Sequence, residues 1–125
     1  DILRNEGISD VLIDTGEIRA LGNRPDGTPW RVGVAGLQGA AKPARRLELS
    51  DRAVATSSTM GTRLGPAGEI GHILDPNGGY STGGSRQVSV IAKSAAWADG
   101  LSTALCLMDE QGIRNASSGV EVIVG

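Results

Sequence analysis

The feature of this sequence that most constrains its fold is a series of short apolar runs, separated by turns rich in glycine and proline. Runs of this length are typical of β-strands, because a helix needs a longer amphipathic stretch to bury one face. The runs predict strands at 10–13, 17–21, 30–34, 45–49, 53–56, 87–92 and 119–124. Loops are expected at 36–43, 57–71 and 77–86, of which the last looks the most flexible.

One long helix is predicted between the last two strands. Ser94 serves as its N-cap, the helix runs to about Met108, and Gly112 lies just beyond its end. Residues 1–7 resemble the last turns of another helix that ends at a glycine, so we expect a mature or cut fragment. The pattern predicts an α+β fold with few helices and a mixed or antiparallel sheet, forming a single domain over residues 1–125.

The core must be built almost entirely from aliphatic side chains. The chain has no phenylalanine, one tyrosine and two tryptophans, so Trp30 and Trp97 are predicted as its bulky fillers. Cys106 is the single cysteine and cannot form an internal disulfide. Its apolar neighbours predict a small buried hydrophobe rather than a catalytic thiol.

The charge distribution argues against a nucleic-acid partner. The net charge is −2, and the one short basic cluster, formed by Lys42, Arg45 and Arg46, has no aromatic residues among it to stack on bases. A solvated loop or strand edge accounts for this cluster.

Asp99 and Thr103 are four residues apart within the predicted helix, so their side chains lie on one face, one turn apart. A carboxylate and a hydroxyl in this arrangement offer two hard oxygen ligands, which suits Mg²⁺ in contact with a phosphate-containing substrate. The alternative is a solvated Asp beside a Thr that bonds back to the preceding turn.

Several segments, in this order along the chain, resemble the FAD:protein FMN transferase family, the ApbE-type flavin transferases. They are IDTGEIRALG at 13–22 with PWRVG at 29–33, AVATS at 53–57, HILDP at 72–76 and ADGLSTA at 98–104. The resemblance implies an α+β flavin-transferase fold of which this chain is the C-terminal portion. The upstream portion, which supplies a backbone carbonyl ligand to the metal and much of the FAD pocket, is not in this chain.

Such enzymes use Mg²⁺ to split FAD, attach FMN to a Ser or Thr hydroxyl of a target flavoprotein, and release AMP. The resemblance makes Asp99 and Thr103 the side-chain ligands of the metal. It also implies a periplasmic location and the possibility of a membrane anchor upstream of residue 1. Two other functions stay open: a flavin-binding module without transferase activity, and an FAD pyrophosphatase that uses water in place of the acceptor.

The resemblance also suggests roles near the flavin. His72 and Asp75 are the candidate catalytic groups for removing a proton from the acceptor hydroxyl, and His72 is also a candidate flavin contact. An equally simple interpretation of His72 is a loop histidine bonded to backbone.

Two further pairs complete the expected flavin site. Gly16 and Glu17 allow close approach of the backbone, unless they form only a tight turn with a solvated carboxylate. Thr56 and Ser57 offer hydroxyls to flavin or phosphate, unless they only cap a turn.

The sequence departs from the usual family pattern at a few positions. They are Thr15-Gly16 in place of a double glycine, Ser58 in place of glycine, Asn77-Gly78-Gly79 in place of Arg-Thr-Gly, and Gly100 in place of alanine. These departures resemble the accessory flavin transferases that serve nitrous-oxide reductase maturation. They bear on substrate preference more than on the reaction.

Overall fold

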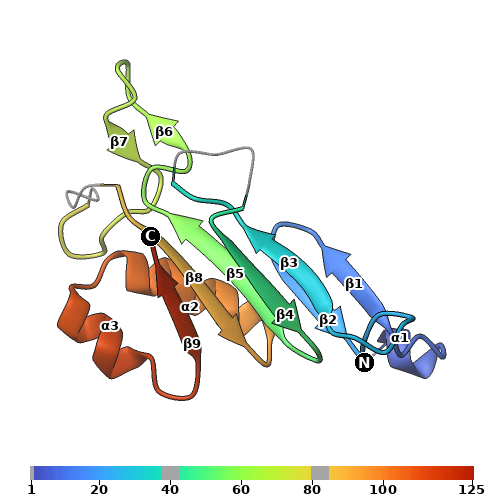
Figure 1. Cartoon of the computed structure of the whole chain (residues 1–125). Coiled ribbons are helices and arrows are strands. Elements are labelled where there is room, and N and C mark those ends of the chain that lie inside the picture. Colours follow the sequence, from blue (N-terminus) through green and yellow to red (C-terminus); the bar gives the residue numbers. More distant parts are fainter. Residues whose placement is uncertain (1, 38–42, 80–84) are drawn as a thin grey trace.

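A computed structural model describes residues 2–37, 43–79 and 85–125 of the chain (Figure 1). Residues 38–42 and 80–84, within the loops predicted at 36–43 and 77–86, lie outside the described residues, as does residue 1. The helices are α1 (Ile2–Asn5), α2 (Ala95–Cys106) and α3 (Glu110–Ala116). The strands are β1 (Val11–Asp14), β2 (Ile18–Leu21), β3 (Trp30–Val34), β4 (Arg45–Leu49), β5 (Ala53–Ser58), β6 (Arg63–Leu64), β7 (Ile70–Gly71), β8 (Gln87–Ala92) and β9 (Glu121–Val124).

The main sheet has five strands in the order β1-β2-β5-β8-β9, and every neighbouring pair is antiparallel. β3 and β4 form a separate antiparallel pair, and so do the short strands β6 and β7. The predicted α+β fold with few helices is therefore confirmed, and the sheet is antiparallel.

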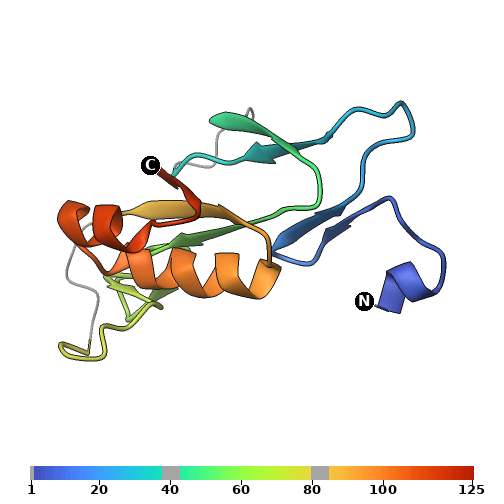
Figure 2. The ribbon, with the colours of Figure 1, turned by 90° about the horizontal axis from the view of Figure 1, so that it is seen from below.

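The fold has three layers. Figure 2 shows α2 and α3 on one face of the main sheet and the β3–β4 pair on the other. Alternate residues of a strand point to opposite faces, so Ala55 of β5 packs toward the helices and Val54 toward β3–β4. β8 is buried from Val88 to Ala92 because both of its faces are covered, which accounts for its unbroken apolar sequence.

The longest helix lies directly against the central strands β5 and β8. Its buried face includes Ala98 and Leu105, each with no exposed surface, in one cluster with Val88 and Val90. Burying a side chain the size of Leu105 contributes about 1.5–3 kcal/mol to folding. The burial holds α2 in place, and its remaining face is available for chemistry.

This helix ends close to the predicted position, about Met108, but the helix that follows it was not predicted. α2 ends at Cys106, and a further helix, α3, begins after Asp109. The Asp109 carboxylate caps α3 by accepting the backbone N–H of Gly112 at 2.7 Å, so Gly112 lies inside α3 instead of ending α2. The β6–β7 pair also lies in a segment, 57–71, that was expected to be a loop.

Of the two tryptophans predicted to fill the core, only Trp30 does so. Trp30 is partly buried and its Nε1–H donates to the Leu21 carbonyl at 3.0 Å. Trp97 is 60% exposed, because it lies one residue before the buried Ala98 and so points away from the sheet. The prediction of Trp97 as core filler was therefore wrong.

Cys106 is buried, as predicted, with 4% of its surface exposed. Burial raises the pKa of its thiol above the ordinary value. Among the described residues, no helix is long and apolar enough to cross a membrane.

Candidate functional site

A cavity of about 710 Å³ lies where the end of β5 meets α2 and the segment that follows β7. Its lining is rich in hydroxyl groups, and we call it the hydroxyl cavity. It is lined by Thr56, Ser57, Ser58, Gly61, Thr62, His72, Ile73, Leu74, Asp99, Thr103 and Leu107. Its volume is in the range of small-molecule sites. Most of the residues predicted from sequence to bind metal or flavin thus surround a single space.

The helix α2 supplies Asp99 and Thr103 to this cavity. Ser94 caps the N-terminus of the helix, and Ala98 and Leu105 fix its buried face against the sheet. Since Asp99 and Thr103 are one turn apart, both reach the cavity from the same side of the helix. The side-by-side arrangement expected from the spacing is therefore present in the structure.

The hydroxyl groups of Ser57, Ser102 and Thr103 form a hydrogen-bonded chain. Ser57 Oγ lies 2.8 Å from Ser102 Oγ and 2.9 Å from Thr103 Oγ1. Ser102 is fully buried, and its Oγ–H donates to the Asp99 carbonyl oxygen at 3.0 Å.

The directions of these hydrogen bonds follow from counting protons. Each hydroxyl carries one proton, and a carbonyl oxygen only accepts. The Ser102 proton goes to the Asp99 carbonyl, so the proton between Ser57 and Ser102 belongs to Ser57. The proton between Ser57 and Thr103 must then belong to Thr103. Both lone pairs of Thr103 Oγ1 are left for another ligand.

Asp99 and Thr103 have the right chemistry for a hard divalent cation. Asp99 is exposed, and among the described residues its carboxylate makes no hydrogen bond or ion pair. A carboxylate oxygen with a hydroxyl oxygen suits Mg²⁺, which prefers oxygen ligands. In the part of the chain that the structure describes, no three His, Cys, Asp or Glu residues gather into a metal cluster. A cation held by this pair would complete its shell with ligands from elsewhere.

His72 reaches the hydroxyl cavity from the segment that follows β7. It is exposed, and its backbone N–H donates to the Thr62 carbonyl at 3.2 Å. The Thr62 backbone N–H donates to His72 Nδ1 at 3.2 Å, which places the ring proton on Nε2, and the same Nδ1 lies 3.3 Å from the Thr62 carbonyl oxygen, to which it donates in the other tautomer. Only the tautomer that donates from Nδ1 to this carbonyl leaves Nε2 as a proton acceptor. The predicted backbone bond and the predicted access to the site are therefore both present.

A glycine beside His72 lets two loops approach closely. A Cβ added to Gly71 would lie 1.9 Å from the Thr59 carbonyl oxygen, so no other residue fits without a shift of the backbone. Thr59 is itself fully buried, and it exchanges hydrogen bonds with Arg86. This contact fixes the loop that carries Thr62 and thereby the position of His72.

Asp75 and Glu17 do not line the hydroxyl cavity. The Asp75 carboxylate accepts the Asn77 backbone N–H at 2.8 Å, which is the geometry of an Asx turn. Gly16, with φ of +112°, lines a smaller cavity of about 250 Å³ between β1, β2 and β3. Thr56 also lines that cavity, and its Oγ1 is paired with Ser89 Oγ at 2.8 Å.

Comparison with known proteins decides the family. A model of the ApbE family matches residues 1–124. The chain belongs to the ApbE family. It is 33% identical over 115 residues to the FAD:protein FMN transferase of Vibrio cholerae serotype O1, covering 89% of this chain and 34% of that protein. The chain thus spans about a third of the length of this curated relative.

Solved ApbE structures match the fold as well. The ApbE protein of Thermotoga maritima superimposes with a TM-score of 0.79 at 29% identity, covering 91% of this chain and 39% of that one. The flavinyl transferase ApbE of Pseudomonas stutzeri, solved in its apo form, gives a TM-score of 0.76 at 35% identity, covering 98% and 39%. The present chain therefore has the fold of one part of an ApbE protein.

Two members of this ApbE site were not assigned from the sequence. Ser102 anchors the hydroxyl chain, and the signal for it was its place three residues after Asp99 on the buried side of the helix. Thr62 holds His72, but it is ten residues away across the β6–β7 pair. That pairing was not foreseen, so sequence spacing offered no sign of the contact.

Proposed function

We propose that this chain forms the metal-binding and phosphate-handling part of an FAD:protein FMN transferase. The expected reaction moves FMN from FAD to a Ser or Thr hydroxyl of an acceptor flavoprotein and releases AMP. Family membership and the names of the relatives support flavin transfer in general. The observation that carries the finer proposal is the hydroxyl cavity, in which Asp99, Thr103, Ser57 and His72 line one space.

Asp99 and Thr103 would hold the Mg²⁺ ion. The hydrogen bond from the Thr103 hydroxyl to Ser57 supports this role, because it uses the Thr103 proton and leaves the oxygen lone pairs for a cation. When bound, Mg²⁺ neutralises charge on the phosphoryl oxygens and on the departing AMP.

The transfer step requires one bond to form and one to break at the FMN phosphorus. The acceptor hydroxyl oxygen bonds to this phosphorus, and the bridging oxygen leaves with AMP and with the bonding electron pair. The hydroxyl proton needs an acceptor within hydrogen-bond reach. His72 Nε2 is our candidate, in the tautomer whose Nδ1–H donates to the Thr62 carbonyl, because His72 lines the cavity while Asp75 does not.

Ser57 and Thr56 have separate expected roles. Ser57 acts as a positioning residue for Thr103, and its own oxygen is already engaged by two hydroxyls. Thr56 lies at the edge shared by the hydroxyl cavity and the smaller cavity that contains Gly16. We propose that the flavin ring enters the site at this edge. Glu17 is close to it in sequence. A periplasmic location and upstream membrane anchoring stay predictions from the family resemblance.

The test is mass spectrometry of a Ser/Thr acceptor peptide after incubation with FAD and Mg²⁺, with AMP measured in parallel. It is run on this chain and on a chimera in which residues 1–125 replace the matching segment of the Vibrio cholerae relative. A gain of one FMN phosphoester with equimolar AMP supports the proposal. Release of FMN and AMP without a modified peptide would indicate a pyrophosphatase. Flavin binding without AMP would indicate a binding module.

A further inference from the structure

A second cavity, of about 660 Å³, lies at the opposite end of β5 from the hydroxyl cavity. We call it the basic cavity, because four of its lining residues carry positive charge. It is lined by Arg4, Arg19, Ser50, Asp51, Arg52, Ala92, Lys93 and Gly119. These residues come from α1, from β2, from the β4–β5 turn and from the segments that follow β8 and precede β9. Positive charge therefore converges here from four places in the chain.

The positive charges are only partly neutralised. Arg4 pairs with Asp51, and Arg52 Nη1 lies 3.7 Å from Glu121 Oε2. Lys93 is exposed and, among the described residues, forms no ion pair. Among the described residues, neither Arg19 nor Lys93 forms an ion pair with a carboxylate, so positive charge remains at this cavity in a chain whose net charge is −2. Such a local excess favours an anionic ligand.

Arg19 is the second sign of a ligand. Its Nη1 atom is buried and has no hydrogen-bond partner in the part of the chain that the structure describes. A buried donor left unpaired destabilises the protein, and more so when it is charged, so a partner that satisfies it gains this free energy on binding. The planar guanidinium fork matches the oxygens of phosphate and carboxylate groups.

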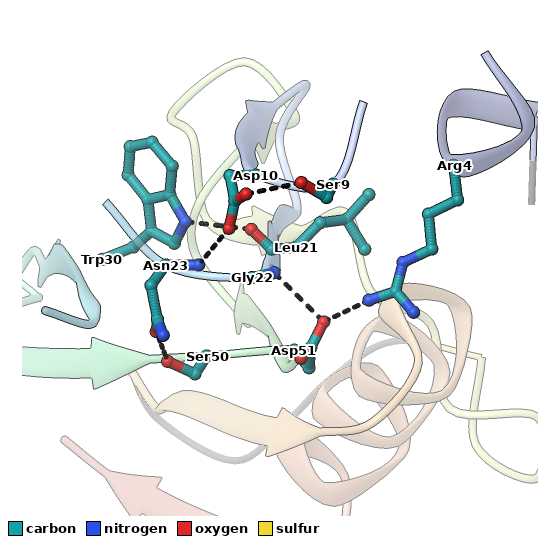
Figure 3. Close-up of polar contacts among 9 residues, drawn as sticks. All are labelled: Arg4, Ser9, Asp10, Leu21, Gly22, Asn23, Trp30, Ser50 and Asp51. Carbon is teal, nitrogen blue, oxygen red and sulfur yellow. Dashed lines mark hydrogen bonds and ion pairs between the residues drawn. The ribbon is translucent and has the colours of Figure 1, made fainter. Parts of the chain in front are cut away.

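The wall of the basic cavity is also held in an unusual conformation. Asp51 has φ of +50° and is the one non-glycine residue with positive φ among the described residues. Its Oδ1 accepts the Gly22 backbone N–H at 3.1 Å and a hydrogen bond from Arg4, as Figure 3 shows. Residues with positive φ persist where surrounding contacts hold them, and they are frequent at ligand sites. Asp51 thus ties α1 to the β4–β5 turn and keeps Arg4 at the cavity wall.

We propose that the basic cavity binds a phosphoryl oxyanion, with Arg19, Arg52 and Lys93 as its cationic contacts. Arg52 is preset for this role, because its Nη2 already donates to the Ile91 carbonyl at 3.2 Å and its guanidinium has further donors to spare. The phosphoryl group belongs to a soluble phosphate ester or to a phospholipid headgroup. The site does not depend on the proposed transferase activity, since it shares no lining residue with the hydroxyl cavity.

The test follows backbone amide shifts of the whole 125-residue chain by NMR during titration with inorganic pyrophosphate, without FAD or Mg²⁺. Sodium chloride at matched ionic strength is the reference. We expect saturable shifts at residues 19, 51–52, 93 and 119. The Lys93→Gln variant should weaken binding by about threefold, because exposed charge pairs are weak. The Arg19→Gln variant should weaken it by about tenfold or more, because it removes a charge-assisted hydrogen bond. Arg46→Gln removes the same charge from an exposed site on β4 and should change the affinity by less than twofold.

The outcomes separate the sources of the ligand. Sedimentation with phosphatidylglycerol vesicles, but not with phosphatidylcholine vesicles, in a Lys93-dependent manner would assign the lipid headgroup. Pyrophosphate binding without vesicle binding would assign a soluble ester. Shifts that match the chloride reference, or that cluster at residues 57, 72 and 99, would overturn the proposal. Equal weakening by Arg46→Gln would do the same. Because Lys93 is exposed, its variant tests the site even if Arg19→Gln disturbs folding.

Discussion

The two ends of β5 carry opposite chemistry. At its C-terminal end the hydroxyl cavity holds the Asp99 carboxylate and hydroxyl oxygens, and no Arg or Lys is among the described residues that line it. At its N-terminal end the basic cavity holds three Arg and one Lys. Both cavities border the same strand, and each has charged side chains of one sign that are not all paired with the opposite charge. The sheet thus separates a site suited to a cation from a site suited to an anion.

The largest effect should come from removing the Asp99 carboxylate, the only one among the described residues that line the hydroxyl cavity. Asp99→Ala is expected to lower AMP release from FAD more than about 100-fold, because even outer contacts of metal sites change affinity or activity by about 10–100-fold. Glu110→Ala, on exposed α3, is the matched control. Pyrophosphate binding at the basic cavity should be unchanged, and an undiminished rate of AMP release would rule out Asp99 as a ligand.

Gly71→Ala should destabilise the fold around the hydroxyl cavity through a steric clash. The added methyl group meets the Thr59 carbonyl oxygen at 1.9 Å, so the loops must separate. We expect the free energy of unfolding in urea to fall by about 1–3 kcal/mol, as for other overpacked positions. Gly78→Ala is the control, since its nearest contact would be 3.9 Å away. Equal stability of the two variants would show that the close approach of Gly71 is not required.

Ser57→Ala tests whether the hydrogen-bonded hydroxyl chain orients the Thr103 hydroxyl for binding a cation. Without Ser57 the Thr103 proton loses its acceptor, and the hydroxyl is free to rotate. We expect the Mg²⁺ concentration for half-maximal AMP release to rise about tenfold, while the rate at saturating Mg²⁺ changes less. Ser117→Ala also removes a side-chain hydrogen bond, from Ser117 to the Ile113 carbonyl on α3, and should leave this concentration unchanged. A loss of rate with no change in the Mg²⁺ requirement would contradict the positioning role.

Gly100→Ala should stabilise the helix without touching either cavity. An added Cβ meets nothing within 4 Å, and Gly100 lies in the interior of α2. Glycine in a helix is less favourable than alanine by about 0.5–1 kcal/mol. We expect the free energy of unfolding to rise by that amount. No gain, or a loss of AMP release, would show that this position needs glycine for another reason.

The smallest effect concerns acid stability near the basic end. Hydrogen bonds from the Ser9 hydroxyl and the Asn23 backbone N–H lower the pKa of Asp10 below its ordinary value of 3.8 (Figure 3). A carboxyl group whose pKa is lower in the folded state stabilises the protein above its unfolded pKa. This contribution is lost as the pH falls through the folded pKa. Asp10→Asn should therefore flatten the dependence of urea midpoint on pH below about 4, and an unchanged slope would contradict it.

Much of the fold could be predicted from local patterns. The strand at 87–92 and the helix after Ser94 have strong signals, because an unbroken apolar run and an N-cap are local features. The helix α3 was not predicted in this way. Gly112 looks like a terminator, but the Asp109 cap three residues earlier starts a new helix that includes it. Two local signals competed, and packing of Ile113 into the core favoured the cap.

The sequence by itself determined which residues share a helix face, since the spacing of Asp99 and Thr103 is fixed by the helical repeat. It also determined the family. Only the tertiary structure decided which distant residues meet that face. Ser57 reaches Thr103 because β5 lies against α2, and His72 joins them because a glycine lets its loop approach Thr59. The same is true of the basic cavity, whose cations are scattered from residue 4 to residue 93 and share no local pattern. Local geometry is encoded over a few residues, whereas such sites depend on which elements the buried core brings together.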